Sequence, residues 1–83
     1  MSTPNNLVLY MYETCPYCVR VMSVVERLGL TIDVRDVRRD PEARRESIAI
    51  GGRTQVPMLS IDGRALYESA DIIRFLEEQV AAQ

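Results

Sequence analysis

The stretch Leu7–Cys18, LVLYMYETCPYC, decides both the fold and the chemistry of this 83-residue chain. It opens with a continuous apolar run, Leu7–Tyr12, which is rich in strand formers and predicts a short strand buried on both faces. It closes with the only two cysteines of the sequence, Cys15 and Cys18, separated by a proline and a tyrosine. Apolar residues then recur at helical spacing as far as Leu28, so the cysteine pair is expected between a strand and a helix.

The middle of the chain predicts a second strand and a second helix. Gly29 is suited to end the first helix as a glycine just beyond its last turn. The alternation of apolar and polar residues over Leu30–Val37 is typical of a strand. Asp40 then has the character of a helix cap, and Pro41 suits the first helical position. This second helix is expected to end at the glycine pair Gly51–Gly52.

The last third predicts a β-hairpin followed by a helix. A strand is expected over Val56–Ile61, and Asp62–Gly63 is the strongest hairpin signal in the chain. The hairpin leads into a brief fourth strand, Arg64–Leu66. Ser69 is a candidate cap for a final helix. The apolar face of that helix consists of Ile72, Ile73, Phe75, Leu76 and Val80.

Together these elements predict an α/β fold with the order β-α-β-α-β-β-α. The first β-α-β unit should contain a parallel pair with a right-handed crossover, whereas the closing hairpin is antiparallel. We therefore expect a four-stranded mixed sheet flanked by three helices. The length predicts a single domain over residues 1–83, with residues 1–5 flexible.

Composition excludes several classes of function. The net charge of −2 and the pI near 5.0 lack the basic surplus typical of nucleic-acid binding. All basic residues are arginine, and the absence of histidine excludes a Cys-His dyad and any zinc site that needs imidazole. No secretory signal is visible, and no apolar run approaches the ~20 residues that span a bilayer. We expect a cytoplasmic monomer, with no membrane or nucleic-acid partner, in a compartment that keeps thiols reduced.

Three interpretations of the Cys15–Cys18 spacing compete. A structural zinc site needs four ligands, and one cysteine pair without histidine does not supply them within the chain. A permanent disulfide that closes so short a loop would stabilise little, because the loop-closure contribution grows with loop length. The remaining interpretation is a redox dithiol, which the position of the pair between a strand and a helix favours.

The two thiols are expected to differ in their chemistry. At a helix N-terminus, unpaired amide groups and the helix dipole favour the thiolate form, so Cys15 is the expected exposed nucleophile. Cys18 lies one turn further along and is the natural resolving thiol. Thr14 is a candidate cap and Pro16 suits the first helical turn. Arg20 is ambiguous, because an exposed helix arginine and electrostatic support of the thiolate are both consistent with its position.

Val56–Pro57 forms a second unusual feature. A proline at the start of a central strand is awkward, because it has no N–H to donate to the neighbouring strand. A cis Val56–Pro57 bond would turn the backbone so that Val56 presents free N–H and C=O groups. Composition alone supports this weakly, since only ~5–6% of X-Pro bonds are cis.

These features resemble the glutaredoxin family. Cys-Pro-Tyr-Cys is the usual dithiol motif of that family, Val56–Pro57 matches its cis-proline motif, and the element order matches the thioredoxin-like fold along nearly the whole chain. The stretch Arg53–Glu78, RTQVPMLSIDGRALYESADIIRFLEE, is also similar to the glutathione-binding part of glutathione S-transferase N-domains. It is similar to the N-terminal domain of two-domain bacterial glutaredoxins as well.

The resemblance implies a glutathione-dependent thiol–disulfide oxidoreductase without a metal. Cys15 would be the nucleophile and Cys18 the resolving thiol. Glutathione would be the reductant, and the substrates would be disulfide-bonded or glutathionylated proteins. Carried over by position, the glutathione-binding residues would be Tyr17, Gln55, Val56, Pro57, Glu68, Ser69 and Asp71.

Two positions depart from the family pattern. Many glutaredoxins carry a lysine three residues before the first cysteine, which helps to hold the glycine carboxylate of glutathione, whereas this chain has Tyr12. Candidate replacements are Arg53, Gln55 and Arg38, in falling order. Typical small glutaredoxins also carry Gly-Gly before the last helix, where this chain has Tyr67–Glu68.

Three other functions remain open at the level of sequence. One is a redoxin of the same fold that is reduced by a thioredoxin reductase. Another is a dimeric carrier that binds a [2Fe–2S] cluster through Cys15 and glutathione, which Pro16 disfavours because relatives specialised for clusters usually differ there. A transferase is disfavoured because these residues contain no all-helical domain to build its second substrate pocket.

Overall fold

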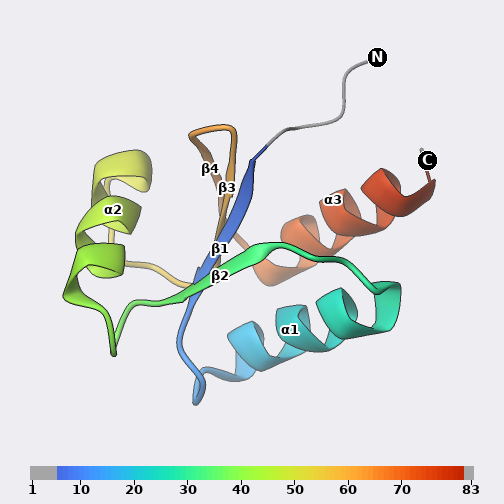
Figure 1. The fold of residues 1–83 in the computed structure, drawn as a ribbon, viewed down its shortest axis with the longest axis horizontal. Helices are drawn as coiled ribbons and strands as arrows, with labels where there is room; N and C mark the ends of the chain where they lie inside the picture. The colour runs from blue at the N-terminus through green and yellow to red at the C-terminus, as the bar shows by residue number, and fades with distance from the viewer. Residues whose placement is uncertain (1–5, 82–83) are drawn as a thin grey trace.

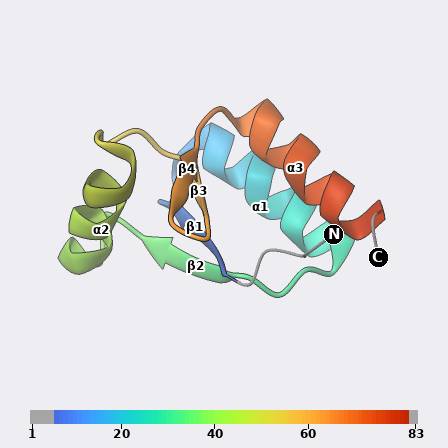
Figure 2. The ribbon, with the colours of Figure 1, turned by 90° about the horizontal axis from the view of Figure 1, so that it is seen from above.

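A computed structural model describes residues 6–81 and shows three layers. The sheet lies in the middle, with α2 on one face and α1 and α3 packed side by side on the other (Figures 1 and 2). The predicted order and fold class are confirmed. The predicted flexibility of residues 1–5 lies outside the described residues. The elements are β1 (Leu7–Met11), α1 (Pro16–Leu28), β2 (Asp33–Asp36), α2 (Pro41–Gly51), β3 (Met58–Ile61), β4 (Arg64–Leu66) and α3 (Ser69–Ala81).

The sheet is mixed, with the strand order β2-β1-β3-β4. β1 pairs with β2 in parallel and with β3 antiparallel, so that Leu9 lies between Val34 and Leu59. β3 and β4 form the antiparallel hairpin. Its two turn residues, Asp62 and Gly63, have φ angles of 50° and 89°. Positive φ at both positions is the geometry of a type I′ turn, as the Asp-Gly pair predicts.

The core lies on both faces of β1. Leu9 and Met11 belong to a buried cluster that includes Val21 of α1 and Leu76 of α3. Val8 and Tyr10 point to the opposite face, where they join a second buried cluster formed with α2 and β3. Side chains alternate between the faces of a strand, so a run that is apolar at every position requires cover on both sides. The prediction of a strand buried on both faces is confirmed.

Local signals set most helix ends. Gly29 and Gly52 follow α1 and α2 with φ angles of 66° and 80°, the left-handed conformation that glycine adopts without steric penalty. Asp40 caps α2, because its carboxylate accepts a hydrogen bond of 3.0 Å from the Glu42 amide. Pro16 and Pro41 occupy the first positions of their helices, as predicted.

The predicted strand limits were too wide. The second strand covers Asp33–Asp36 rather than Leu30–Val37, and the third begins at Met58 rather than Val56. β2 is an edge strand paired only with β1, so its length is set by the register of that pairing. Val34 is accordingly exposed. Val56 and Pro57 precede β3 as irregular backbone.

No helix within residues 6–81 is both long enough and apolar enough to cross a membrane.

A polar network joins α2 to the sheet. The Glu46 carboxylate of α2 accepts hydrogen bonds from the Tyr10 hydroxyl at 3.2 Å and pairs with Arg35 at 2.7 Å. Arg35 also donates to the Asp40 carboxylate at 3.2 Å. That hydrogen bond holds the pKa of Asp40 below its ordinary value of 3.8. β1, β2 and the start of α2 are therefore linked by one chain of polar contacts.

The network predicts an acid-dependent contribution of Asp40 to stability. A carboxyl group whose pKa is lowered by folding stabilises the native state above its unfolded pKa, and the stabilisation is lost as the pH falls through the lowered value. Asp40→Asn keeps a helix cap but removes the charge. We expect Asp40→Asn to lower the urea midpoint at neutral pH, with the difference shrinking between about pH 5 and about pH 2. A difference that stays constant over that range would contradict the electrostatic origin.

Gly51, the last residue of α2, lies against the Tyr67 ring. A β-carbon at Gly51 would overlap the Tyr67 hydroxyl and would lie 2.8 Å from its Cζ atom. We therefore expect Gly51→Ala to lower the free energy of unfolding by about 1–3 kcal/mol, the usual range for overpacking. Ala49→Ser, on the exposed side of the same helix, is the control and should change it by less than about 0.5 kcal/mol. Urea denaturation measures both free energies of unfolding. An unchanged value for Gly51→Ala would show that the Tyr67 ring moves aside freely.

Candidate active site

The cysteine pair lies at the junction of β1 and α1. Cys15 is the N-cap of α1, with extended backbone angles, and its Sγ accepts the backbone N–H of Cys18 at 3.4 Å. The Cys15 carbonyl accepts the Val19 N–H at 2.9 Å, which is the first bond of the helix. The prediction that Thr14 caps this helix is wrong, because the sulfur of Cys15 takes that role. The Cys15 sulfur thus satisfies one of the amide groups that a helix N-terminus leaves unpaired.

The two thiols are buried to different degrees. Cys18 has no exposed surface and Cys15 keeps only 6%, so the prediction of a freely exposed nucleophile is wrong. The reason is the capping geometry, which turns the Cys15 sulfur back over the first turn and into the cluster that holds Met11 and Val21. Burial, together with the hydrogen bond to Cys15, raises the pKa of Cys18 to about 12. Cys18 is therefore a protonated thiol at neutral pH, and Cys15 is the one of the two cysteines that keeps any exposed surface.

One pocket next to the motif collects most of the residues expected to bind glutathione. It has a volume of about 370 Å³. The Val56–Pro57 bond at its wall is cis, as predicted. Asp71 lies in the first turn of α3 but is not part of the lining. The lining residues are Tyr17, Gln55, Val56, Pro57, Glu68 and Ser69.

Glu68 has an unusual backbone at the rim of this pocket. Its φ angle is 71°, in the left-handed region that residues with side chains rarely adopt. Its carbonyl accepts the Ile72 N–H at 3.0 Å, and its side chain accepts Gln55 Nε2 at 3.4 Å. The helix begins at Ser69, so Glu68 rather than Ser69 holds the capping position. The prediction of a Ser69 cap is wrong by one residue because the turn from β4 enters the helix through this left-handed residue.

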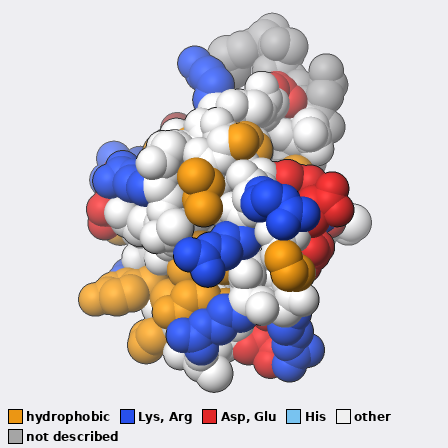
Figure 3. All heavy atoms as spheres, turned by 90° about the vertical axis from the view of Figure 1, so that its left-hand side faces the viewer, with side chains coloured by type: hydrophobic (Ala, Val, Ile, Leu, Met, Phe, Trp, Pro, Cys, Tyr) orange, Lys and Arg blue, Asp and Glu red, His pale blue; other side chains and the backbone are white. Residues whose placement is uncertain are grey.

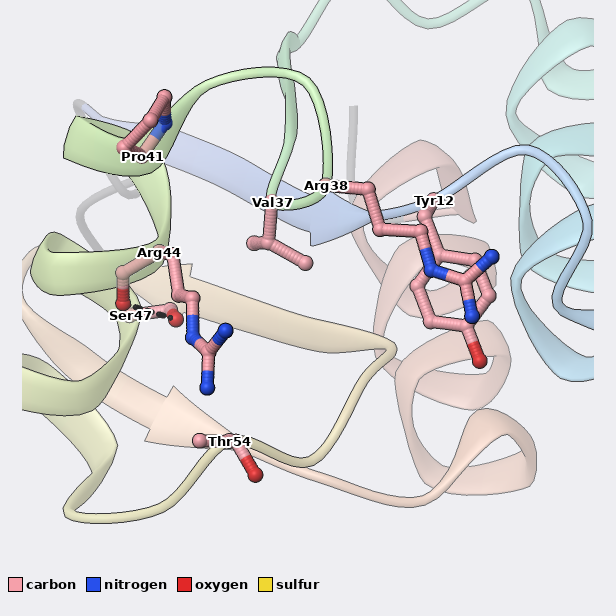
Figure 4. Close-up of a pocket in the computed structure, with 7 residues that line it drawn as sticks. All are labelled: Tyr12, Val37, Arg38, Pro41, Arg44, Ser47 and Thr54. Carbon is pink, nitrogen blue, oxygen red and sulfur yellow. Dashed lines mark hydrogen bonds between the residues drawn. The ribbon is translucent and has the colours of Figure 1, made fainter.

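Tyr12 stands beneath a cation from another part of the chain. The Arg38 guanidinium lies 4.0 Å above the Tyr12 ring, and Arg38 Nη1 donates to the Thr14 hydroxyl at 3.3 Å. Arg38 comes from the loop after β2, and Figure 4 shows it extended across the ring. A positive charge therefore lies beside Tyr12, the position where many glutaredoxins have lysine.

Arg38 and Arg44 line a second pocket of about 350 Å³ between Tyr12 and α2. In Figure 4 the Arg44 side chain extends from α2 toward this space, with Thr54 on the opposite wall. Figure 3 views the molecule from the side of α2, where several basic side chains lie near the middle and acidic ones mainly toward the margins. Within residues 6–81, Arg35 and Arg39 form ion pairs, whereas the guanidinium groups of Arg38 and Arg44 have no carboxylate partner.

The sequence pattern did not single out Arg44. Arginines are interspersed with acidic residues from position 33 to 46, a pattern that is typical of a solvated face of mixed charge. In the folded chain these arginines differ in their surroundings. Arg35 and Arg39 pair with carboxylates, whereas Arg38 and Arg44 line one pocket. The one available signal was spacing: Pro41, Arg44 and Ser47 recur every three residues and so share a face of α2.

Two predicted site residues lie elsewhere. The Arg53 guanidinium stacks 4.1 Å above the Tyr67 ring and lines neither of these two pockets. Arg20 is exposed and forms no ion pair within the described part of the chain, which matches the interpretation as a solvent-facing helix arginine. In that same part, no group of three or more histidine, cysteine, aspartate or glutamate side chains is arranged to hold a metal ion.

Comparisons with known proteins agree with this geometry. The family model described as Glutaredoxin matches residues 7–66, from β1 to β4. Glutaredoxin 3 of Escherichia coli K12 is 34% identical over 59 residues, which is 71% of each chain. A probable glutaredoxin of Synechocystis is 27% identical over 73 residues, covering 87% of this chain and 83% of its own.

Solved structures extend the comparison to the whole fold. The thioredoxin-like protein BC3987 superimposes with a TM-score of 0.75 at 23% identity, covering 89% of this chain and 99% of its own. Glutathione transferase Omega 3C from Trametes versicolor is 30% identical with a TM-score of 0.76. That match covers 92% of this chain but 34% of the transferase. The chain therefore belongs to the glutaredoxin family and is a thiol–disulfide oxidoreductase with a thioredoxin-like fold.

Proposed function

We propose that this protein is a monomeric, single-domain oxidoreductase that uses glutathione to reduce protein disulfides and glutathione mixed disulfides. The observation that carries the proposal is the pocket beside the cysteine motif, whose walls come from α1, the segment before β3 and the start of α3. Its lining combines backbone next to Pro57, a carboxylate at Glu68 and a helix N-terminus at Ser69. These groups complement a small peptide that carries both an ammonium and a carboxylate.

We assign the γ-glutamyl group of glutathione to the α3 end of this pocket. The amides at the start of α3 suit its carboxylate, because a helix N-terminus favours anions. The Glu68 carboxylate suits its ammonium. The backbone of Val56 would pair with the cysteinyl residue, as an added strand pairs with a sheet edge. The thiol of glutathione would then face Cys15, which precedes Tyr17 of the same pocket.

We assign the glycine carboxylate of glutathione to Arg38 and Arg44. Both guanidinium groups line the pocket beside Tyr12, and neither has a carboxylate partner among the described residues. Arginine binds carboxylates with charge-assisted hydrogen bonds that are stronger than neutral ones. Gln55 lines the glutathione pocket and is a further candidate, whereas Arg53 is engaged with Tyr67. This assignment replaces the missing lysine at Tyr12 with cations from the loop after β2 and from α2.

The proposed reaction is thiol–disulfide exchange. The Cys15 thiolate attacks the glutathione sulfur of a mixed disulfide, so a Cys15–glutathione bond forms and the protein thiolate leaves and takes up a proton. A second glutathione thiolate then attacks that glutathione sulfur, which releases glutathione disulfide and reduced Cys15. Each cycle consumes one free glutathione, and the other half of the released glutathione disulfide comes from the substrate.

Cys18 has a separate role with protein disulfides. Cys15 first forms a mixed disulfide with the substrate and releases the first substrate thiol. Cys18 then loses its proton and attacks the Cys15 sulfur, so a Cys15–Cys18 disulfide forms and the second substrate thiol leaves. Two glutathione molecules reduce this disulfide and leave as glutathione disulfide. Because the pKa of Cys18 is raised to about 12, its thiol stays protonated in the reduced enzyme and does not compete as the first nucleophile. The glutathione route does not require Cys18 at all.

Single substitutions of the cysteines separate these roles. We expect Cys15→Ser to abolish turnover of the cysteine–glutathione mixed disulfide, because the one other thiol of the chain, Cys18, is fully buried. We expect Cys18→Ser to retain it. The assay couples glutathione disulfide formation to NADPH oxidation by glutathione reductase. A second assay replaces both glutathione and glutathione reductase with thioredoxin reductase and so tests the alternative reductant. Turnover by Cys15→Ser, or turnover only with thioredoxin reductase, would overturn the proposal.

The assignment of the glycine carboxylate predicts a binding defect. Each charge-assisted hydrogen bond contributes about 1.5–3 kcal/mol, so Arg38→Ala combined with Arg44→Ala should raise KM for the mixed disulfide about tenfold or more. The effect on kcat should be smaller, because neither group contacts the reacting sulfurs in this assignment. Arg45→Ala removes a neighbouring exposed arginine that does not line the pocket and is the matched control. Equal KM values in the double variant and the control would exclude the assignment.

A further inference from the structure

A third pocket lies along α1 on the side away from the glutathione pocket. It has a volume of about 280 Å³, and none of its residues lines the two pockets described above. With 3.6 residues per turn, Val19, Met22 and Glu26 form a stripe roughly opposite Tyr17, which faces the glutathione pocket. We call it the α1 groove. It is lined by Met11, Glu13, Val19, Met22, Ser23 and Glu26.

The floor of the α1 groove is apolar and adaptable. Val19 is 52% exposed, which makes it one of the most exposed large apolar side chains among the described residues. Met22 is half-buried beside it, and Met11 is buried at the end of β1. Methionine side chains adjust easily to different apolar partners. An isolated exposed valine needs no explanation, but one that lines a groove together with two methionines offers a place for an apolar side chain.

The rim of the α1 groove is acidic. Glu13 stands at the end near the cysteines, and Glu26 stands about two turns further along α1 than Val19. Arg39 pairs with Glu13 at 3.1 Å. Glu26 is exposed and has no ion-pair partner within residues 6–81. The charge available to a ligand in this groove is therefore the Glu26 carboxylate, which complements a lysine or arginine.

We propose that the α1 groove docks the polypeptide of protein substrates, through an apolar side chain at Val19 and Met22 and a basic side chain at Glu26. This rests on the proposed function, since it supplies the protein-binding surface for the Cys15 reaction. Along α1, Val19 lies ~6 Å and Glu26 ~16 Å from Cys15, and an extended peptide advances ~3.3 Å per residue. The preferred substrate then has an apolar residue about two positions, and a basic residue about five positions, from its reactive cysteine.

Glutathionylated peptides test the proposal. The first probe is Arg-Gly-Gly-Leu-Gly-Cys-Gly-Leu-Gly-Gly-Arg, whose symmetry makes the direction of binding irrelevant. The second replaces both arginines with glutamate. The small probe is the cysteine–glutathione mixed disulfide, which has no peptide to occupy the groove.

We expect the natural protein to reduce the arginine peptide with a kcat/KM about two- to fivefold above that of the glutamate peptide, the range that an exposed ion pair provides. Glu26→Arg should reverse this preference. Glu78→Arg makes the same charge change at an exposed position of α3 and should leave the preference intact. Both variants should reduce the small probe at the unaltered rate.

Val19→Ser tests the apolar part of the groove. It should lower kcat/KM for the arginine peptide while leaving the small probe unaffected, and its exposed position argues against misfolding. Two results would overturn the docking proposal, provided that the small probe is still reduced. One is equal kcat/KM values for the two peptides with the natural protein, and the other is an unchanged preference of Glu26→Arg for the arginine peptide. Loss of turnover of the small probe by the natural protein would instead overturn the proposed function and the docking proposal with it.

Discussion

The burial of β1 on both faces is the constraint on which the rest of the structure depends. Its alternate side chains require helices on opposite sides of the sheet, and its two edges pair with β2 and β3. A strand held in this way has a fixed end, and that end leads within a few residues to Cys15. The capping sulfur therefore lies on rigid scaffold rather than on a free loop, which is how precise chemical sites are usually supported.

The second organising feature is the separation of charge around the cysteine motif. An acidic side chain and a helix N-terminus lie at one end, at Glu68 and Ser69. At the other end, beside Tyr12, lie two guanidinium groups, of Arg38 and Arg44, that form no ion pair with any carboxylate of the described residues. Neither group is contiguous in the sequence with the cysteines. Arg38 and Arg44 reach the site because β1 pairs in parallel with β2, so the segment after β2 lies near the end of β1. Glu68 and Ser69 reach it because β4 runs antiparallel to β3, so the end of β4 lies beside the start of β3 and the end of β1.

Local patterns predicted the elements well because their causes are local. Gly29, Gly52, Asp40 and the Asp62–Gly63 turn each satisfy a steric or hydrogen-bonding need of their immediate neighbours. Errors arose where distant partners intervene. The length of β2 depends on its register with β1. The position of Arg44 in the pocket beside Tyr12 was not predicted, because the fold decides which arginines form ion pairs with carboxylates.

The sequence by itself determined the order of elements, the two-faced burial of the first strand and the cysteine pair at a helix start, since all three follow from residue type and spacing. The tertiary structure alone decided how deeply Cys15 is buried, that Arg38 covers Tyr12, and that Gln55 and Glu68 share one pocket. The physical reason is that burial and charge pairing depend on distances through space. In this chain those distances are set when the sheet brings remote segments to the end of β1.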